Sequence, residues 1–306
     1  MDRVIQVNNL VKNYGKLTAV NGISFHVERG EIFGLLGENG AGKTTTLEIV
    51  EGLRSLTNGS VAVLGYDLTD NLSEIKRKIG VQLQSSAYYN FLNLQEILRL
   101  FGGFYGMKSD PAKLLEMVDL SDKAKSLVGS LSGGQKQRFS IVASLVNDPE
   151  IVFLDEPTTG LDPLARRNLW DLIGKIKAQG KTVVLTTHYM EEAEKLCDRI
   201  AIMDKGQILV MDEVSELIKH TKNPYKIHFK SKKMDREATD KLMNLGHMEQ
   251  VAKKESEYEL RLKNRKDLYQ ALGIIQLFKP ESLAVGKASL EDLFIELTGK
   301  RIGDEE

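Results

Sequence analysis

The stretch Gly37-Glu38-Asn39-Gly40-Ala41-Gly42-Lys43-Thr44 matches the phosphate-loop pattern G-x-x-x-x-G-K-[ST] at every fixed position. The mostly apolar run 31–36 before it predicts a buried strand, and residues 45–50 after it predict the start of a helix. Glycines let the backbone turn tightly and bring N–H donors close to a phosphate at the positive end of that helix. The stretch therefore predicts a nucleoside triphosphate site in an α/β fold.

The roles of the loop residues follow from this geometry. Lys43 is expected to reach the β- and γ-phosphates, and the Thr44 hydroxyl is expected to hold Mg²⁺. The bland alternative is an ordinary glycine-rich turn between a strand and a helix, which the full match and the flanking elements disfavour. The predicted nucleotide-binding residues of this loop are Gly37, Asn39, Gly40, Ala41, Gly42, Lys43, Thr44 and Thr45.

The composition describes an ordinary globular protein. A length of 306 residues predicts about two domains, and 42% hydrophobic residues suffice for a core. The net charge of −1 gives no basic field for nucleic acid. The single cysteine, Cys197, excludes an intrachain disulfide and is interpreted as core packing. Neither a signal peptide nor a run of ~18 apolar residues is found, so we expect no membrane span.

Polar side chains follow further apolar runs that predict buried strands. Asp155 and Glu156 follow residues 151–154, and His188 follows residues 182–186. Because the carboxyl ends of parallel strands face one crevice, these groups are expected beside the phosphate loop. Asp155 is then expected to hold Mg²⁺, directly or through water. Glu156 is interpreted as general base or water orienter, and His188 as a contact to the γ-phosphate.

Two glutamine-containing segments add to this crevice. Residues 79–84 predict another strand, at whose end Gln84 could touch Mg²⁺ or the attacking water; Gln82 has the same facing, and the pattern does not choose between them. Leu131-Ser132-Gly133-Gly134-Gln135 predicts the start of a helix reaching about Val146, with a Ser-x-x-Gln capping box. Paired glycines are not needed for capping and cost ~1 kcal/mol each relative to alanine. They indicate a second place where a phosphate is approached.

The order of these motifs over residues 4–215 closely resembles the ATP-binding cassette (ABC) ATPases. The resemblance identifies residues 131–135 as the family's signature and Gln84 as its Q-loop glutamine. It also implies that Tyr14 stacks on adenine and that Asp162, in Gly160-Leu161-Asp162, is the D-loop aspartate. ATP and Mg²⁺ are the cofactors that it implies.

The resemblance further implies a head-to-tail dimer with two ATP molecules between the subunits. Ser132, Gly133, Gly134 and Gln135 of one chain then face the γ-phosphate of the ATP held by Lys43 of the other chain. With one phosphate loop per chain, a complete site needs a second ATPase subunit.

The predicted fold class is α/β: a P-loop NTPase domain of ABC type with a parallel-sheet core, an antiparallel β subdomain and a helical subdomain. This domain is predicted over 1–220, with the helical subdomain at about 86–146. A small α+β accessory domain is predicted over 221–306, and its basic run 230–233 is interpreted as a solvated face, with a membrane-surface or regulatory role as the alternative.

The tail 289–299 is similar to that of ATPase subunits of ABC-2-type exporters, including drug, antibiotic-resistance and sodium exporters. This resemblance implies a cytoplasmic subunit, peripheral on the inner face of the membrane, that works with an integral membrane permease. Tyr88, Tyr89, Phe91 and Leu92 offer a docking surface for that permease, or equally the packing of the helical subdomain.

Two other function classes also use a phosphate loop. A soluble ABC ATPase that remodels ribosomes or nucleic acid is the main alternative, but the charge balance gives no nucleic-acid footprint, and no nucleic acid is expected. A kinase or GTPase is disfavoured because the guanine-selecting Asn-Lys-x-Asp pattern is missing from the sequence and the signature is present.

Overall fold

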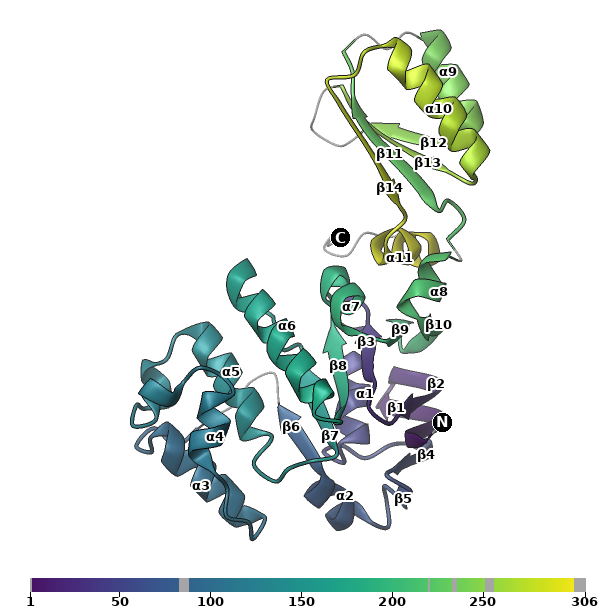
Figure 1. The fold of residues 1–306 in the computed structure, drawn as a ribbon. Helices are drawn as coiled ribbons and strands as arrows, with labels where there is room; N and C mark the ends of the chain where they lie inside the picture. The colour runs from purple at the N-terminus through teal and green to yellow at the C-terminus, as the bar shows by residue number, and fades with distance from the viewer. Residues whose placement is uncertain (1, 83–87, 220, 233–235, 251–255, 300–306) are drawn as a thin grey trace. The chain divides into compact units, whose positions relative to one another are not determined.

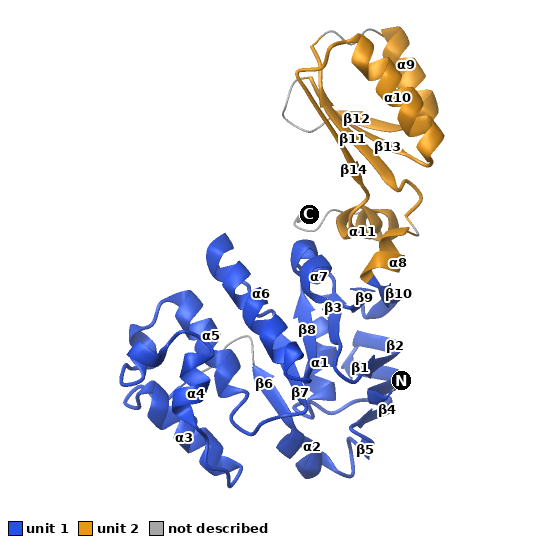
Figure 2. Ribbon diagram, in the orientation of Figure 1, with its two compact units in different colours: residues 1–213 blue, residues 214–306 orange. Residues whose placement is uncertain are grey.

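The computed structural model describes residues 2–82, 88–219, 221–232, 236–250 and 256–299. The chain divides into two compact units, Met1–Glu213 and Val214–Glu306 (Figure 2). Within the described residues, no helix is both long enough and apolar enough to cross a membrane.

A six-stranded sheet forms the centre of the first unit, with the strand order β10-β9-β3-β8-β7-β6 (Figure 1). The pairs from β9 to β6 are parallel, and β10 joins β9 antiparallel at the edge. Every residue of β3, β7 and β8 is buried, as the continuous apolar runs predicted. The strands are β3 (Ile32–Leu36), β6 (Ile79–Gln82), β7 (Ile151–Asp155), β8 (Thr182–Thr187), β9 (Arg199–Asp204) and β10 (Gln207–Glu213).

A second, four-stranded sheet has the order β2-β1-β4-β5 and is antiparallel. Its strands are β1 (Arg3–Tyr14), β2 (Leu17–Glu28), β4 (Asn58–Val63) and β5 (Tyr66–Asp67). This sheet is the antiparallel β subdomain predicted from the sequence, and β1 and β2 are long, with 12 residues each. The β1–β2 ladder contains several register shifts, and these bulges explain why the alternation looks loose in the sequence.

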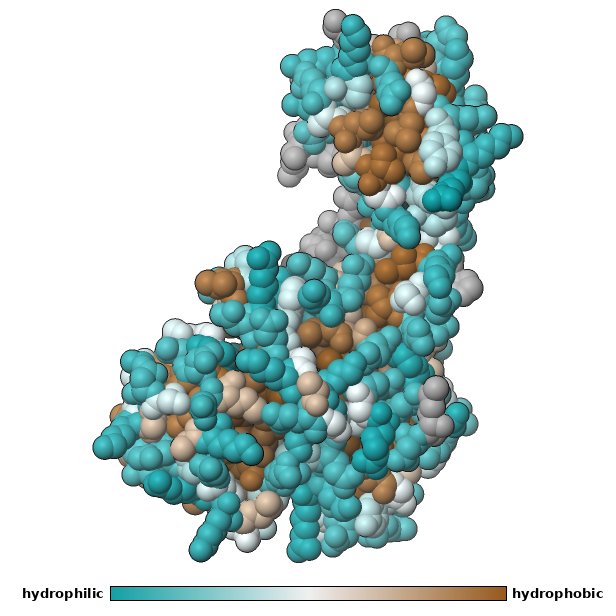
Figure 3. Space-filling model, in the orientation of Figure 1, coloured by the Kyte–Doolittle hydropathy of each residue, from teal (hydrophilic) through white to brown (hydrophobic). Residues whose placement is uncertain are grey.

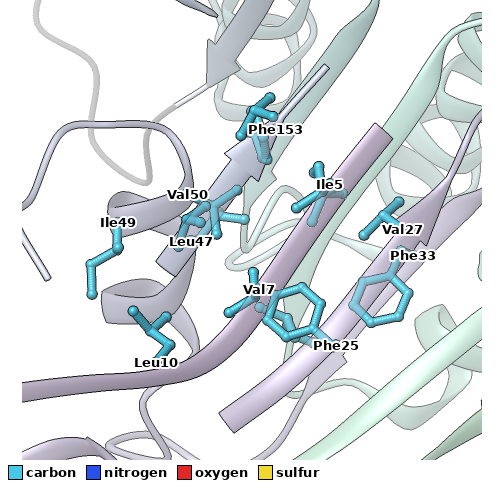
Figure 4. Packing of buried hydrophobic residues seen from close by; sticks show 14 of the residues in the cluster. Ile5, Val7, Leu10, Phe25, Val27, Phe33, Leu47, Ile49, Val50 and Phe153 are labelled. Atoms are coloured by element: carbon cyan, nitrogen blue, oxygen red, sulfur yellow. The ribbon is translucent and has the colours of Figure 1, made fainter. Parts of the chain in front are cut away.

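The two sheets and the helix after the phosphate loop share one hydrophobic core (Figure 4). Phe25 of β2 stacks on Phe33 of β3 with ring centroids 5.4 Å apart. Leu47, Ile49 and Val50 of α1 (Lys43–Val50) are buried in the same cluster. This packing fixes the start of α1 at the carboxyl end of β3, which sets the shape of the loop between them.

The remaining helices of this unit include the predicted helical subdomain. Its helices are α3 (Leu94–Phe104), α4 (Pro111–Glu116) and α5 (Gly133–Ala143), with short 3₁₀ turns at Ser121–Lys123 and Val128–Ser130. Asp110 caps α4, with Pro111 at its first position. Elsewhere in the unit lie α2 (Leu72–Lys78), α6 (Pro163–Ala178) and α7 (Met190–Leu196).

The second unit is an antiparallel sheet of order β12-β13-β11-β14 with helices packed on it. Its elements are α8 (Val214–Lys219), β11 (Tyr225–Lys230), α9 (Arg236–Leu245), β12 (Gly246–Gln250), β13 (Glu257–Leu262), α10 (Arg265–Leu277), β14 (Ser282–Lys287) and α11 (Leu290–Thr298). The α+β character agrees with the sequence prediction, whereas α8 and β12 were not predicted.

The division between the units falls after Glu213, earlier than the predicted boundary at 220. The reason is α8, which packs on α11 of the second unit; beyond it, the Lys222 N–H donates to Glu296 Oε2 at 3.0 Å. The basic run is also only partly a solvated face. Lys230 and Lys232 each lie 3.3 Å from a Glu281 carboxylate oxygen, and Lys233 lies outside the described residues.

Candidate active site

The phosphate loop lies between β3 and α1, and its conformation requires glycine. Gly42 has φ +98°, and a Cβ there would lie 2.5 Å from the Ala19 carbonyl oxygen. Gly37 is restricted by space, because its Cβ would lie 2.4 Å from the Met203 carbonyl oxygen. Gly42 is the N-cap of α1, so the first N–H groups of that helix face the loop. The loop thus has the concave row of donors that phosphate binding needs.

Lys43 is buried inside this loop, with its side chain 4% exposed. Its Nζ donates to the carbonyl oxygens of Gly37 at 2.8 Å and Glu38 at 3.0 Å. The same Nζ lies 3.5 Å from Glu156 Oε1. Burial lowers the pKa of Lys43, while the Glu156 carboxylate opposes that shift. Lys43 is therefore a desolvated cation, held by weak carbonyl acceptors and one carboxylate.

Asp155 ends β7 directly beside the loop helix and is 5% exposed. Its Oδ1 accepts hydrogen bonds from Thr44 Oγ1 at 3.1 Å and Thr186 Oγ1 at 2.5 Å. Burial raises the pKa of Asp155, and the two hydroxyl groups lower it. The Thr44 hydroxyl and one Asp155 carboxylate are the oxygen ligands expected of a Mg²⁺ that keeps waters and phosphates as its other ligands. In the described part of the chain, no group of three or more His, Cys, Asp or Glu side chains forms an all-protein metal site.

Glu156 adopts φ +46°, a left-handed conformation that is rare for a residue with a side chain. Its N–H donates to Thr186 Oγ1 at 3.0 Å, and its Oε2 accepts from Thr159 Oγ1 at 3.1 Å. His188 Nδ1 lies 3.3 Å from the same Oε2. The His188 imidazole, followed by the charge of Lys43, lowers the pKa of Glu156 to about 2 against the effect of burial.

The strand order explains why these groups meet. In the order β3-β8-β7, the phosphate loop, His188 and the Asp155–Glu156 pair follow three adjacent parallel strands. Thr186 on the middle strand bonds to both acidic residues, a role that the sequence analysis missed. The only signal available was a threonine at the end of an otherwise apolar run.

The signature residues lie in a different place. Ser132 and Gln135 form the predicted capping box of α5, in which Gln135 Oε1 accepts from the Ser132 N–H at 2.9 Å. Asp162 caps α6 by accepting from the N–H groups of Leu164 at 3.0 Å and Ala165 at 2.9 Å. These termini line one cavity of about 360 Å³, which no phosphate-loop residue lines.

The two signature glycines differ in their surroundings. A Cβ on Gly134 would lie 3.2 Å from the Ala165 Cβ, so the close approach of α6 accounts for that glycine. A Cβ on Gly133 would meet nothing within 4 Å in this chain. Of these two glycines, packing within the chain therefore explains Gly134 but not Gly133.

The other predicted site residues are placed as follows. Tyr14 ends β1 and is 38% exposed, with Lys12 and Arg54 beside its ring at 5.1 and 5.5 Å. Gln84 lies outside the described residues, and Gln82, the last residue of β6, is buried. Asn39 and Gly40 are exposed in the loop, Ala41 is buried, and Thr45 is half-buried in α1.

Comparison with known proteins decides the family. The chain is 35% identical to the linearmycin resistance ATP-binding protein of Bacillus subtilis, across 98% of this chain and 100% of that protein. This chain belongs to the ABC transporter family. The family's profile, described as ABC transporter, matches residues 20–159. The ABC ATPase is also 40% identical to Nod factor export ATP-binding protein I of Ralstonia nicotianae, over 71% of this chain and 69% of that one.

Solved ABC cassettes share the fold. An ATP-binding subunit of an ABC transporter aligns with TM-score 0.64 and 31% identity, covering 71% of this chain and 92% of that one. A dimeric post-hydrolysis cassette bound to ADP and Pi aligns with TM-score 0.63 and 28% identity, covering 68% and 98%. The predicted family, fold class and ATPase activity are thereby confirmed: this chain is an ABC ATPase that binds and hydrolyses ATP.

Sequence analysis also missed a buried carboxyl group near this site. Glu51 follows α1 and is 1% exposed, and neither of its carboxylate oxygens has a hydrogen-bond partner in the structure. Burial, followed by the charges of Asp155 and Glu48, raises the pKa of Glu51 to about 8. Its signal in the sequence is a glutamate between the apolar run of α1 and a glycine.

Glu51 gives a prediction for stability against pH. Because the pKa of Glu51 is raised in the folded state, its effect on the free energy of unfolding is most favourable below the unfolded pKa near 4.5. That stability is lost as pH rises towards 8. Glu51→Gln should remove this loss. Its free energy of unfolding relative to wild type should therefore be about 2–4 kcal/mol more favourable at pH 8 than at pH 4.5. Urea unfolding of both proteins across this range measures it, with the exposed Glu116→Gln as control. Parallel pH profiles for wild type and Glu51→Gln would contradict the assignment.

Proposed function

We propose that this ABC ATPase is the ATP-hydrolysing subunit of a bacterial exporter. In this role it couples ATP-driven closure of a head-to-tail dimer to export through a separate membrane subunit. The observation that carries the dimer is the separation of two half-sites: the loop with Lys43 and the cavity with Ser132 and Asp162 do not share lining residues. A second chain can bring its Ser132–Gln135 segment to the ATP on Lys43. Solved structures of related cassettes that are described as dimeric support a dimer of this chain.

The loop residues and Tyr14 are proposed to bind ATP, with Lys43 on its β- and γ-phosphates. Thr44 and Asp155, with Gln84, are proposed to hold Mg²⁺, which when bound neutralises charge on the β- and γ-phosphates. Asp155 is buried and already bonded to the Thr44 hydroxyl, which supports this pairing. Asp162 and the signature residues are proposed to complete the site from the other chain.

Glu156 and His188 are proposed to act on the attacking water and the γ-phosphate. A carboxylate with a pKa of about 2 is a weak proton acceptor but remains an ionised hydrogen-bond acceptor at neutral pH. Of the two roles expected for Glu156, orienting the water fits this pKa better than abstracting its proton. His188, 3.3 Å from Glu156, is proposed to position that carboxylate and to contact the γ-phosphate of bound ATP.

The membrane partner is proposed to dock on the helical subdomain. Tyr88 packs inward against Phe139, with ring centroids 5.3 Å apart, whereas Tyr89 and Phe91 are 49% and 77% exposed. Tyr88 also lines an apolar cavity of about 490 Å³ with Phe101 and Tyr105. Packing therefore accounts for Tyr88, whereas Tyr89 and Phe91 are the aromatic residues proposed for docking. The exposed aromatics and the apolar cavity together suit an amphipathic helix.

Export, as the direction of transport, rests on the relatives. One is named for linearmycin resistance and another for Nod factor export. Through the proposed partner the chain would lie at the cytoplasmic face of the membrane. The alternative is a soluble ABC ATPase that remodels ribosomes or nucleic acid.

Affinity purification from detergent-solubilised native membranes tests the proposal. We expect a polytopic membrane protein to copurify in near-equal amount. Phe91→Asp, which places a charge on the exposed aromatic group, should reduce that yield while ATP binding is unchanged. Recovery only from the soluble fraction, together with ribosomes or nucleic acid, would instead support the alternative function.

A further inference from the structure

Strand β14 of the second unit lies at the margin of its sheet with its outer side open. In the strand order of the described residues, its one neighbour is β11. All residues of β14 are exposed, including Leu283 at 37% and Val285 at 51%. Apolar side chains gather on the visible face of this unit (Figure 3). An exposed edge strand with apolar side chains is a template for pairing with another strand.

The hydrogen-bonding pattern shows which groups of β14 point outward. The Ala288 N–H donates to the Pro224 carbonyl at 3.1 Å, just beyond the register pair of Tyr225 and Lys287. Because hydrogen-bonded pairs alternate along an antiparallel ladder, the even-numbered residues of β14 bond to β11. The N–H and C=O groups of Leu283, Val285 and Lys287 therefore face the open edge.

The side chains of the same strand continue the core of the unit. Leu283 and Val285 are register partners of Phe229 and Ile227, so they lie on the same face of the sheet. Phe229 and Ile227 are 3% and 0% exposed in the core cluster. The apolar face thus extends to the sheet margin, where the side chains of β14 remain in solvent.

We propose that β14 pairs antiparallel with β14 of a second copy, about a two-fold axis through Ala284. This register joins two four-stranded sheets into one and keeps both apolar faces on the same side. Leu283 of each copy then forms a hydrogen-bonded pair with Val285 of the other. The Lys287 side chain of each copy then approaches Glu281 of the other, which lies one residue before β14 and whose N–H donates to the Lys230 carbonyl of β11 at 2.8 Å. Opposite charges and apolar pairs both favour this alignment.

The neighbouring registers that keep the same faces together are poorer. An axis through Val285 places Lys287 opposite Leu283, and an axis through Leu283 leaves Lys287 without a partner strand. In the described part of the chain no ion pair is recorded for Lys287, whereas Glu281 already attracts Lys230 and Lys232 at 3.3 Å. The Ala284 register alone of these three matches both apolar and charged side chains.

This contact goes beyond the proposed ATP-dependent dimer, because it needs neither nucleotide nor signature. A single pair of edge strands is a small interface. It therefore contributes most to association when another contact already joins the two chains. It would keep two ATPase subunits together when their nucleotide sites are open.

Cysteine crosslinking without nucleotide tests the register. At the axis, Ala284 faces its own copy in a non-hydrogen-bonded pair, where Cβ atoms lie about 4.5–5.5 Å apart. Ala284→Cys should therefore give a disulfide-linked dimer on oxidation. The matched control Ser282→Cys places its two cysteines about 13 Å apart along the strands and should give no disulfide-linked dimer. Wild type should give none either, since Cys197 is buried.

A second variant tests the pairing without a cysteine. Val285→Pro deletes an N–H that faces the open edge and leaves the β11 ladder intact. Sedimentation without nucleotide should show self-association weakened at least about tenfold, with Val285→Thr unchanged. Circular dichroism checks that Val285→Pro remains folded. Absence of the Ala284→Cys dimer, equal crosslinking of Ser282→Cys, or unchanged association of Val285→Pro would each overturn the proposal.

Discussion

Glu156→Gln should lower the rate of ATP hydrolysis by at least about 100-fold and leave ATP affinity within a few-fold of wild type. The substitution keeps the shape of the side chain but replaces an ionised acceptor with a neutral amide. In the structure, that acceptor is supported by Thr159 Oγ1 at 3.1 Å and by His188 Nδ1 at 3.3 Å. A water placed there would lose the carboxylate that orients it for attack on the γ-phosphate.

The same variant should trap the proposed dimer. Because ATP still binds and is not consumed, ATP and Mg²⁺ should raise the fraction of Glu156→Gln that sediments at twice the 34.2 kDa mass of the chain above its value without nucleotide. Steady-state hydrolysis, equilibrium ATP binding and sedimentation velocity measure the three effects, with Glu191→Gln as an exposed control. Hydrolysis at the wild-type rate would exclude Glu156 from this role, and a monomer with bound ATP would exclude closure by ATP.

The pH dependence follows from the pKa of Glu156. Since the folded-state pKa is lowered to about 2, this carboxylate stabilises the fold above the unfolded pKa of 4.5, and the contribution is lost as pH falls towards 2. The free enzyme should therefore show no acidic limb from Glu156 between pH 5 and 8. A rate that falls through this range with an apparent pKa that Glu156→Gln abolishes would contradict the lowered pKa.

Lys43→Ala should weaken ATP binding by about 30- to 100-fold, because charge-assisted hydrogen bonds to phosphate are worth about 2–3 kcal/mol. Affinity for adenosine, which lacks phosphates, should not change. Calorimetric titration with each ligand separates the two, and the exposed Lys175→Ala serves as control. Thermal unfolding must accompany it, because removing Lys43 leaves Glu156 without a buried cation at 3.5 Å. Unchanged ATP affinity in a folded variant would contradict the assignment.

Much of the fold could be predicted because its central strands are apolar along their whole length. The runs of β3, β7 and β8 can only be buried on both faces, and polar residues at their ends then share one crevice. Strand β12 was missed since Gly246–Gln250 is polar, and it forms by pairing with β13. Helix α8 was missed because its packing on α11 joins segments distant in sequence.

The predicted site residues came from local patterns, whereas the missed ones depend on tertiary neighbours. Nothing near Thr186 in the sequence indicates that it bonds to Asp155 and to the Glu156 N–H. Glu51 looks like a surface residue at a helix end, and only the packing around it removes its water. The choice between Gln82 and Gln84 also depends on the family resemblance, since the sequence pattern predicts the same facing for both and Gln84 lies outside the described residues.

Because Lys43 already has partners, a nucleotide that binds it must replace existing contacts of its ammonium group. Its ammonium group has acceptors at 2.8 and 3.0 Å and a carboxylate at 3.5 Å before any ligand arrives. To bind Lys43, a phosphate oxygen must displace these groups. An isolated phosphate ion therefore competes poorly with them, whereas a triphosphate that is also held along the loop competes well. In the proposed function, the γ-phosphate takes the place of the Glu156 carboxylate beside Lys43. ATP binding would then free the carboxylate that is proposed to orient the attacking water.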